Sequence, residues 1–261
     1  MSEIAIRRSS MSFDLKGKRA LVTGASSGIG LAVCELLGAF GANVALNHLP
    51  DDPRGPEAVE MLRSQGFAVI EAPGNVAEAA SAKDMVATAI AGLGGIDYLV
   101  NNAGTSGTVA PIPFNDLDAM DEEFWATILS TNLLGPFRCS QAAAGELRRS
   151  RGAIVNTASV AGLGLRGSSV AYSASKAALI NLTGGLARAL APDVRVNAVA
   201  PGLVRTPWTQ NWPDDRKRAT EAQTLLGRMA APEEVAEAIV FLCAGPAYIN
   251  AQTLVINGGS A

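Results

Sequence analysis

The sequence predicts an α/β fold: a doubly wound domain with a central parallel sheet of about seven strands and helices on both faces. Short, near-continuous apolar runs alternate along the chain with longer segments of helical pattern, as is typical of a parallel sheet that is covered on both sides. With 261 residues, 48% hydrophobic and 17% charged, the chain can bury a large core and does not have the composition of a disordered protein.

Apolar runs bounded by turn residues are expected to form the strands. They lie at residues 19–23, 43–47, 67–72, 96–104, 152–159, 194–202 and 253–259. Helical patterns separate them, among others at residues 31–41, 54–66, 77–95 and 233–244. No repeat or linker interrupts this order. We therefore expect one domain over residues 14–261, preceded by a flexible tail over residues 1–13, for which a short basic interaction arm is the alternative.

Composition excludes several classes of function. The net charge is −3 and no basic run occurs, so no nucleic-acid partner is expected. No apolar run is long enough for a membrane helix and the first residues lack the core of a signal peptide. Cys34, Cys139 and Cys243 are far apart, which indicates reduced thiols and a cytoplasmic location. The single histidine, His48, leaves no spare histidine for a Ser-His-Asp relay or a zinc site, and no metal is expected.

A glycine-rich turn, Thr23–Gly30, joins the first strand to the first helix. Glycines allow a tight turn and a close approach to a pyrophosphate, while the helix N-terminus offers unpaired N–H groups. The spacing is GxxxGxG, and a strand-to-helix turn that needs positive φ is the alternative interpretation. The expected contacts with a dinucleotide are Gly24, Ser26, Ser27, Gly28, Ile29 and Gly30.

Ligands of doubly wound sheets bind beyond the carboxyl ends of the strands, where the strand order reverses. This places function at the ends of the first and fourth strands. The fourth strand ends in Asn101–Gly104, which supplies a polar side chain and a tight bend. Asn102, Ala103 and Gly104 are therefore candidate cofactor contacts, although Asn102 alone also fits a simple turn residue.

Tyr172 and Lys176 interrupt an otherwise small and apolar helical segment, and a spacing of four places them on one helical face. A free phenol has a pKa of about 10. A nearby cation favours the phenolate and lowers this pKa, which would make the pair a general acid/base. Ser159 ends a buried strand 13 residues earlier, where its hydroxyl can hold a substrate carbonyl. A surface Tyr/Lys pair and a turn-forming serine are the alternatives.

Together these motifs resemble the short-chain dehydrogenase/reductase (SDR) family in its single-domain form, a Rossmann fold. The TGxxxGxG turn, NNAG, Ser159, the Tyr172/Lys176 pair and Pro201-Gly202 stand in the family's order and cover nearly the whole chain after the tail. The resemblance implies hydride transfer between NAD(P)(H) and a ketone or secondary alcohol. Four residues are then catalytic: Asn132, Ser159, Tyr172 and Lys176.

The resemblance assigns each of these residues a role. Tyr172 is the acid/base, Ser159 orients the substrate oxygen, and Lys176 lowers the pKa of the tyrosine. Tyr172 and Lys176 also contact the nicotinamide ribose. Asn132 steadies a water in the proton relay. Near the nicotinamide amide, the implied cofactor contacts are Pro201, Gly202, Val204 and Thr206.

Two departures from the family bear on the cofactor. Asn75-Val76 replaces the usual Asp-Val pair beside the adenine, and an asparagine carbonyl can still accept from the exocyclic amine. At the end of the second strand His48 stands where NAD-preferring members carry an acid, so no carboxylate is expected to repel a 2′-phosphate. Contacts are expected from Asn47, His48, Leu49 and Arg54. We favour NADP over NAD, although Ser27 occupies a position that is often arginine in NADP-preferring members.

The sequence leaves the identity of the substrate undecided. A 3-oxoacyl thioester, a polyol or sugar, and a steroid-like or small cyclic ketone all fit. The expected walls of its pocket are residues 105–118, 160–169 and 204–226, with a substrate loop at about 203–226. Trp208 and Trp212 fit an apolar lid or an oligomer contact, and Arg166 fits an anion contact or a solvated loop residue. The resemblance further implies a homotetramer or homodimer.

Two other functions remain open at this point. One is a non-catalytic nucleotide-binding or redox-sensing protein of the same fold, against which the four intact catalytic positions argue. The other is an epimerase or dehydratase of the same family, which typically has a larger substrate domain.

Overall fold

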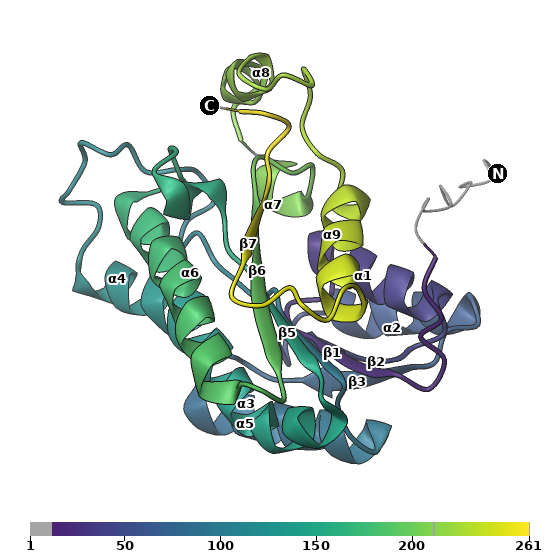
Figure 1. Cartoon of the computed structure of the whole chain (residues 1–261). Coiled ribbons are helices and arrows are strands. Elements are labelled where there is room, and N and C mark those ends of the chain that lie inside the picture. The colour runs from purple at the N-terminus through teal and green to yellow at the C-terminus, as the bar shows by residue number, and fades with distance from the viewer. Residues whose placement is uncertain (1–11, 211, 261) are drawn as a thin grey trace.

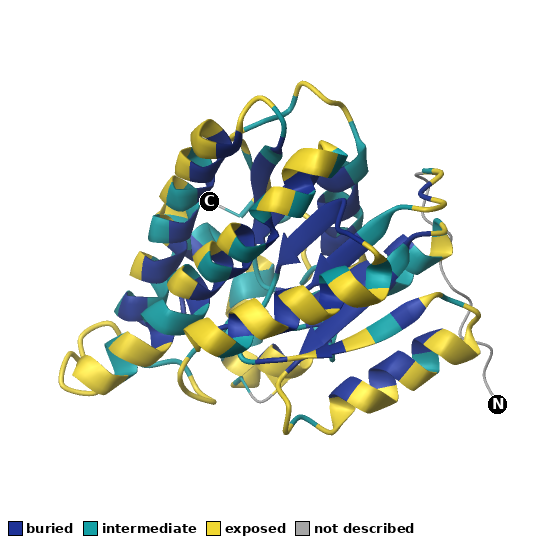
Figure 2. Ribbon diagram, turned by 90° about the horizontal axis from the view of Figure 1, so that it is seen from below, coloured by how far each residue is buried: buried dark blue, intermediate teal, exposed yellow. Residues whose placement is uncertain are grey.

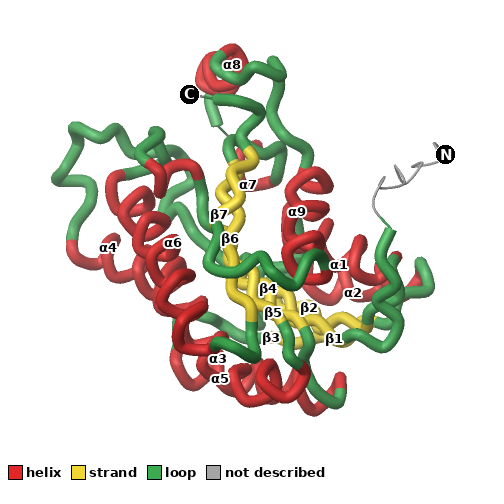
Figure 3. The backbone as a smooth tube through the Cα atoms, in the orientation of Figure 1, coloured by secondary structure: helices red, strands yellow, loops and turns green. Residues whose placement is uncertain are grey.

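Seven parallel strands form one sheet in the order β3-β2-β1-β4-β5-β6-β7 in the computed structural model (Figures 1 and 3). The structure describes residues 12–210 and 212–260. Residues 1–11 of the predicted tail lie outside the described residues. Phe13 already belongs to the fold, because its ring packs edge-on against Phe40 at a centroid distance of 5.9 Å.

Every strand lies at its predicted run, so the doubly wound fold is confirmed. The strands are β1 (Arg19–Val22), β2 (Asn43–His48), β3 (Val69–Pro73), β4 (Tyr98–Asn101), β5 (Ala153–Thr157), β6 (Arg195–Pro201) and β7 (Thr253–Ile256). The central strands β4 and β5 are buried throughout, because helices cover both of their faces.

Helices cover both faces of the sheet, and Figure 2 shows buried stripes along the longer ones. The helices of the described residues are α1 (Gly28–Ala39), α2 (Arg54–Ser64), α3 (Ala79–Leu93), α4 (Glu122–Leu129), α5 (Gly135–Ser150), α6 (Val170–Leu190), α7 (Pro207–Gln210), α8 (Asp214–Ala222) and α9 (Pro232–Ala244). α1, α2 and α9 share one apolar core, and α3, α5 and α6 share the other. No helix in the described residues is long and apolar enough to span a membrane.

Glycines end two of the predicted helices. Gly66 follows α2 with φ +87° and Gly94 caps α3 with φ +73°, a region that residues with a Cβ rarely adopt. Between α4 and α5 the backbone widens into a π-helical turn, η1 (Ser130–Leu134). Turns of this kind are frequent at functional sites, and this one carries Asn132.

The order of the strands opens a crevice at the ends of β1 and β4. From β1 the chain passes outward to β2 and β3, and then returns to place β4 on the other side of β1. The helices after these two strands therefore diverge, and their connecting turns leave space between them. The crevice lies at the edge of the sheet that the sequence predicts.

Candidate functional site

A cavity of about 1130 Å³ lies at this edge of the sheet and extends over the ends of β5 and β6. Almost all predicted site residues line it: Gly24, Ser26, Ser27, Gly28, Ile29, Asn47, His48, Leu49, Asn75, Val76, Asn102, Ala103, Gly104, Ser159, Tyr172, Lys176, Pro201, Gly202, Val204 and Thr206. Two predicted residues, Gly30 and Asn132, do not line the cavity. The fold therefore brings most of the predicted residues to one cavity, although several side chains make contacts other than those expected.

The glycine turn is shaped to hold a phosphate. Gly24 and Gly28 have φ +60° and +57°. A Cβ on Gly30 would lie 2.5 Å from the carbonyl oxygen of Gly24, so Gly30 allows α1 to pack tightly on the turn and contributes no cavity surface. Ser27, the N-cap, makes no side-chain cap hydrogen bond. The N-terminal N–H groups of α1 therefore remain available to an anion.

The side chain of Asn102 holds the glycine turn in place. Its amide Nδ2 donates to the carbonyl oxygens of Thr23 and Gly24, at 3.2 and 3.0 Å. The Oγ1 of Thr23 accepts in return from the backbone N–H groups of Asn102 and Ala103, both at 3.0 Å. These bonds tie the end of β4 to the end of β1. Asn102 thus lines the cavity and also shapes its floor.

Asn47 and His48, at the end of β2, have side chains that are committed inside the protein. The Oδ1 of Asn47 accepts from the N–H of Gly24 at 3.1 Å, and its Nδ2 donates to three carbonyl oxygens. Both ring nitrogens of His48 have partners: the carbonyl oxygen of Leu49 at 2.7 Å and the carboxylate of Glu71 at 2.9 Å. Since both side chains are buried, neither is free to bind the ribose as expected.

A carboxylate does stand at this end of the cavity, contrary to the expectation. Asp52 accepts from the Oγ of Ser26 at 2.7 Å and from the guanidinium of Arg54 at 2.8 and 2.9 Å. The hydrogen bonds from Arg54 hold the pKa of Asp52 well below its ordinary value. Asp52 lies four residues after His48, at the end of β2, and its carboxylate reaches back to the glycine turn through Ser26. Its charge is paired with Arg54, which also lines the cavity.

The side chain of Asn75 is also engaged. Its Oδ1 accepts from the N–H of Ala77 at 3.0 Å, and its Nδ2 donates to Glu78 at 2.8 Å. These bonds stabilise the turn into α3. The contact between the Oδ1 of Asn75 and an adenine amine therefore stays a prediction.

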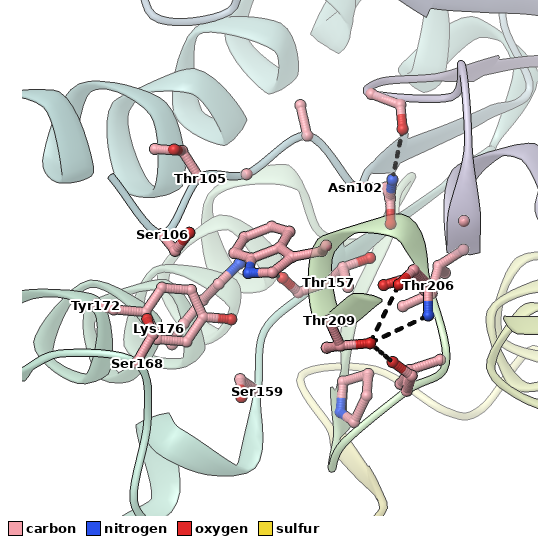
Figure 4. A pocket seen from close by; sticks show the side chains of 18 of the residues that line it. Asn102, Thr105, Ser106, Thr157, Ser159, Ser168, Tyr172, Lys176, Thr206 and Thr209 are labelled. Carbon is pink, nitrogen blue, oxygen red and sulfur yellow. Dashed lines mark hydrogen bonds between the residues drawn. The ribbon is translucent and has the colours of Figure 1, made fainter. Parts of the chain in front are cut away.

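Tyr172 and Lys176 extend from one face of α6 toward the end of β5, where Ser159 follows the strand. Figure 4 shows these residues on one side of the pocket with Ser168, opposite Asn102, Thr206 and Thr209. The Nζ of Lys176 lies 5.6 Å from the centre of the Tyr172 ring and donates to the carbonyl oxygen of Thr157 at 2.8 Å. The hydroxyl of Ser159 is near enough to the phenol of Tyr172 to lower its pKa. The serine–tyrosine pair thus presents two hydroxyl groups to one position in the cavity.

The expected lowering of the tyrosine pKa by the lysine is not seen in the structure. Burial raises the pKa of Tyr172 to about 12, and the hydroxyl of Ser159 opposes this only in part. Burial also lowers the pKa of Lys176 to about 8. The physical reason is desolvation, which disfavours the charged form of the half-buried Tyr172 and of the buried Lys176. Tyr172 is accordingly a neutral phenol near pH 7, the form that donates a proton.

Asn132 lies one layer behind the cavity. Its Oδ1 accepts from the N–H of Thr105 at 2.8 Å, and its Nδ2 donates to the carbonyl oxygen of Thr105 at 2.9 Å and to Ser175 at 3.2 Å. The side chain is fully buried. A Cβ on Gly104 would lie 3.3 Å from its Oδ1 and 3.5 Å from the Nζ of Lys176, so both atoms border the space beside this glycine.

The predicted substrate walls are present in part. Trp208 packs edge-on against Tyr172 at 6.0 Å, and both Trp208 and Trp212 line the cavity. From the first predicted wall only Thr105 and Ser106 line it, while residues 107–118 do not. Ser168 and Arg216, from the second and third predicted walls, line the cavity as expected, whereas Asp52 and Thr157 line it without having been predicted. The Asp-x-Arg pattern at residues 52–54 is the one signal that could have indicated a paired carboxylate.

Comparisons with known proteins agree with this geometry. A family model described as enoyl-(acyl carrier protein) reductase matches residues 24–261. A Staphylococcus aureus protein named 3-oxoacyl-[acyl-carrier-protein] reductase FabG is 37% identical over 93% of this chain and 97% of its own length. A Vibrio cholerae protein of the same name is 38% identical over 94% and 98%.

Solved structures agree as well. A short chain dehydrogenase from Burkholderia cenocepacia, in complex with NADP, superposes with a TM-score of 0.84 at 33% identity, over 95% of this chain and 99% of that one. A short-chain dehydrogenase/reductase from Brucella melitensis superposes with a TM-score of 0.85 at 32% identity, over 96% and 99%.

Proposed function

The chain belongs to the short-chain dehydrogenase/reductase family, and we propose that it reduces a ketone with NADPH, using Tyr172 as the proton donor. One observation carries the proposal. The glycine turn, which is shaped for a pyrophosphate, and the Ser159–Tyr172 pair line the same cavity. A dinucleotide held by the turn and a carbonyl held by the pair therefore share one space.

The chain's own residues perform the proton chemistry in this proposal. When bound, the cofactor supplies the hydride. Ser159 donates a hydrogen bond to the substrate oxygen, and Tyr172 delivers a proton to the same oxygen as it becomes an alkoxide. Lys176, held by the carbonyl oxygen of Thr157, places positive charge beside the phenolate that remains. Asn132 fixes the backbone at Thr105, and its Oδ1 borders the space beside Gly104 that the Nζ of Lys176 also borders.

NADP fits the adenosine end of the cavity. The side chain of Arg54 is 55% exposed. Asp52, which also accepts a hydrogen bond from Ser26, holds the Arg54 guanidinium beside the glycine turn. The free edge of this guanidinium can donate to a 2′-phosphate. The structure of the Burkholderia cenocepacia relative contains NADP, which supports the same choice.

We expect Arg54→Gln to raise the KM for NADPH about tenfold and to leave the KM for NADH almost unchanged. The reason is that only the phosphate of NADPH needs the arginine, and a partly exposed charge-assisted contact is worth roughly 1–1.5 kcal/mol. Initial rates with both coenzymes on the same variant provide the control. An equal rise for both coenzymes would mean that Arg54 supports the turn rather than the phosphate.

The relatives named as 3-oxoacyl reductases make 3-oxoacyl compounds the first substrates to examine. The proposed function is tested by a panel of 3-oxoacyl thioesters, sugar ketones and cyclic ketones, followed by NADPH absorbance. We expect steady consumption of NADPH with at least one class and an alcohol product. Binding of NADPH without turnover across the whole panel would favour the sensor alternative.

The proposal also covers the extent of the catalytic domain, the location of the protein and its oligomeric state. We treat residues 14–261 as one catalytic domain with its substrate loop at 203–226, and we expect a cytoplasmic homotetramer or homodimer. Exposed apolar residues support self-association: Leu134 and Phe137 near the start of α5, and Leu254 and Val255 on the edge strand β7. The mass of the protein in solution tests the oligomeric state.

A further inference from the structure

Two arginines line the substrate half of the cavity, and neither has an acidic partner among residues 12–210 and 212–260. Arg166 lies in the loop before α6, and Arg216 lies on α8, which stands beyond the ends of β6 and β7 in Figure 1. In the described part of the chain neither forms an ion pair. Both guanidinium groups instead rest on aromatic rings, Arg166 on Phe114 at 5.8 Å and Arg216 on Trp212 at 4.6 Å.

The two guanidinium groups also act on each other. Burial lowers the pKa of Arg216, and the charge of Arg166 lowers it further. Among the described residues that line the cavity, Asp52 is the sole carboxylate, and it is paired with Arg54 at the adenosine end. The substrate half therefore carries uncompensated positive charge. An anion between the two arginines would relieve their repulsion.

This charge lies close to the catalytic tyrosine. The Nη2 of Arg216 donates to the carbonyl oxygen of Gly167 at 3.2 Å, and a Cβ on Gly167 would lie 3.1 Å from the ring of Tyr172. The next residue, Ser168, is 96% buried and lines the cavity, and its Oγ has no hydrogen-bond partner among the described residues. One cation and one unpartnered hydroxyl therefore flank the glycine that packs on the reacting phenol.

We infer that the substrate carries an anionic oxygen group, a carboxylate or a phosphate, which Arg166 and Arg216 bind and Ser168 helps to hold. This inference rests on the proposed function, because it adds a recognition element to the same ketone site. Guanidinium groups suit both anions, since each accepts two parallel hydrogen bonds from a planar donor pair. The aromatic rings hold the guanidinium planes in place and reduce the entropy lost on binding.

The inference is tested with two matched substrate pairs and NADPH. Acetoacetate and methyl acetoacetate differ in a carboxylate, whereas acetoacetyl-CoA and acetoacetyl-N-acetylcysteamine differ in phosphates. For each pair we take the ratio of kcat/KM for the anionic member to kcat/KM for the neutral member. We expect this ratio to exceed one in one pair, and we expect Arg166→Gln or Arg216→Gln to lower it about 10- to 100-fold. The pair that responds identifies the source of the anion.

Arg218→Gln is the matched control, because Arg218 lies on α8 like Arg216 but does not line the cavity. This variant should leave both ratios unchanged.

The outcomes separate the two proposals. If the wild type reduces the neutral ester or thioester and the arginine variants leave both ratios unchanged, the anion inference is wrong while ketone reduction stands. If the wild type reduces none of the four compounds, the anion inference is overturned, and the sugar and cyclic ketones of the panel decide whether ketone reduction stands. Arg166→Gln is the cleaner variant, because Arg216 also bonds to Gly167 and its loss alters the loop.

Discussion

Replacing Tyr172 with phenylalanine is expected to lower kcat for ketone reduction about a thousandfold and to leave the Kd for NADPH within about twofold of the wild type. The phenol is neutral near pH 7, since burial raises its pKa to about 12, and the variant removes the one proton that reaches the substrate oxygen. A general acid contributes about 10²–10⁴ to a rate. Single-turnover kinetics and coenzyme fluorescence titration measure the two quantities separately.

Tyr248→Phe is the matched control for this variant, because Tyr248 is fully exposed and does not line the cavity. We expect wild-type rates from it. If Tyr172→Phe retained more than about a tenth of the wild-type kcat, another group would have to supply the proton. Ser159, whose hydroxyl lies near the phenol of Tyr172, would be the first candidate.

Replacing Lys176 with methionine is expected to lower kcat about a hundredfold and, in the cofactor-free protein, to raise the melting temperature at pH 7 by a few degrees. Burial lowers the pKa of Lys176 from 10.5 to about 8, which corresponds to a folding penalty of up to about 3 kcal/mol below pH 8. The lost hydrogen bond to Thr157 costs about 1 kcal/mol. The free energy gained by removing the buried charge exceeds the free energy lost with the hydrogen bond. We therefore expect Lys176→Met to lower activity and to raise stability.

The pH dependence checks the sign of this effect. Between pH 8 and pH 10.5 the folded protein releases the Lys176 proton while the unfolded chain still holds it. The free energy of unfolding of the wild type therefore rises with pH through this window, because the penalty for burying the charged lysine is progressively lost. The advantage of Lys176→Met over the wild type should shrink across the same range. Melting curves at pH 7 and pH 9.5 measure it, with the exposed Lys83→Met as control. A variant that melts lower than the wild type at pH 7 contradicts this reasoning.

The sequence predicted the sheet and most residues of the cavity, because both depend on local patterns. Apolar runs separated by helical segments set the strand order that opens the crevice. Gly24 and Gly28 could be read as turn glycines because residues with a Cβ rarely adopt their positive φ. The pairing of Tyr172 with Lys176 follows from helical spacing alone. These features need no knowledge of distant contacts.

The roles of the polar side chains could not be predicted in the same way, because each depends on partners far away in the sequence. Asn47 bonds to Gly24 and Gly74, and Asn132 bonds to Thr105. His48 bonds to Glu71 on the neighbouring strand. Nothing local distinguishes an asparagine that faces a ligand from one that ties loops together. The same applies to the pKa of Tyr172, since burial, which decides it, is a property of the whole fold.

The most direct test of hydride transfer with Tyr172 as the acid uses NADPH deuterated at the transferring position of the nicotinamide, with a ketone from the panel. Mass spectrometry of the alcohol formed by the wild type should show one deuterium on the carbinol carbon for every coenzyme oxidised, and Tyr172→Phe should form this product about a thousandfold more slowly. An alcohol without deuterium, or equal rates for the two proteins, would contradict the account.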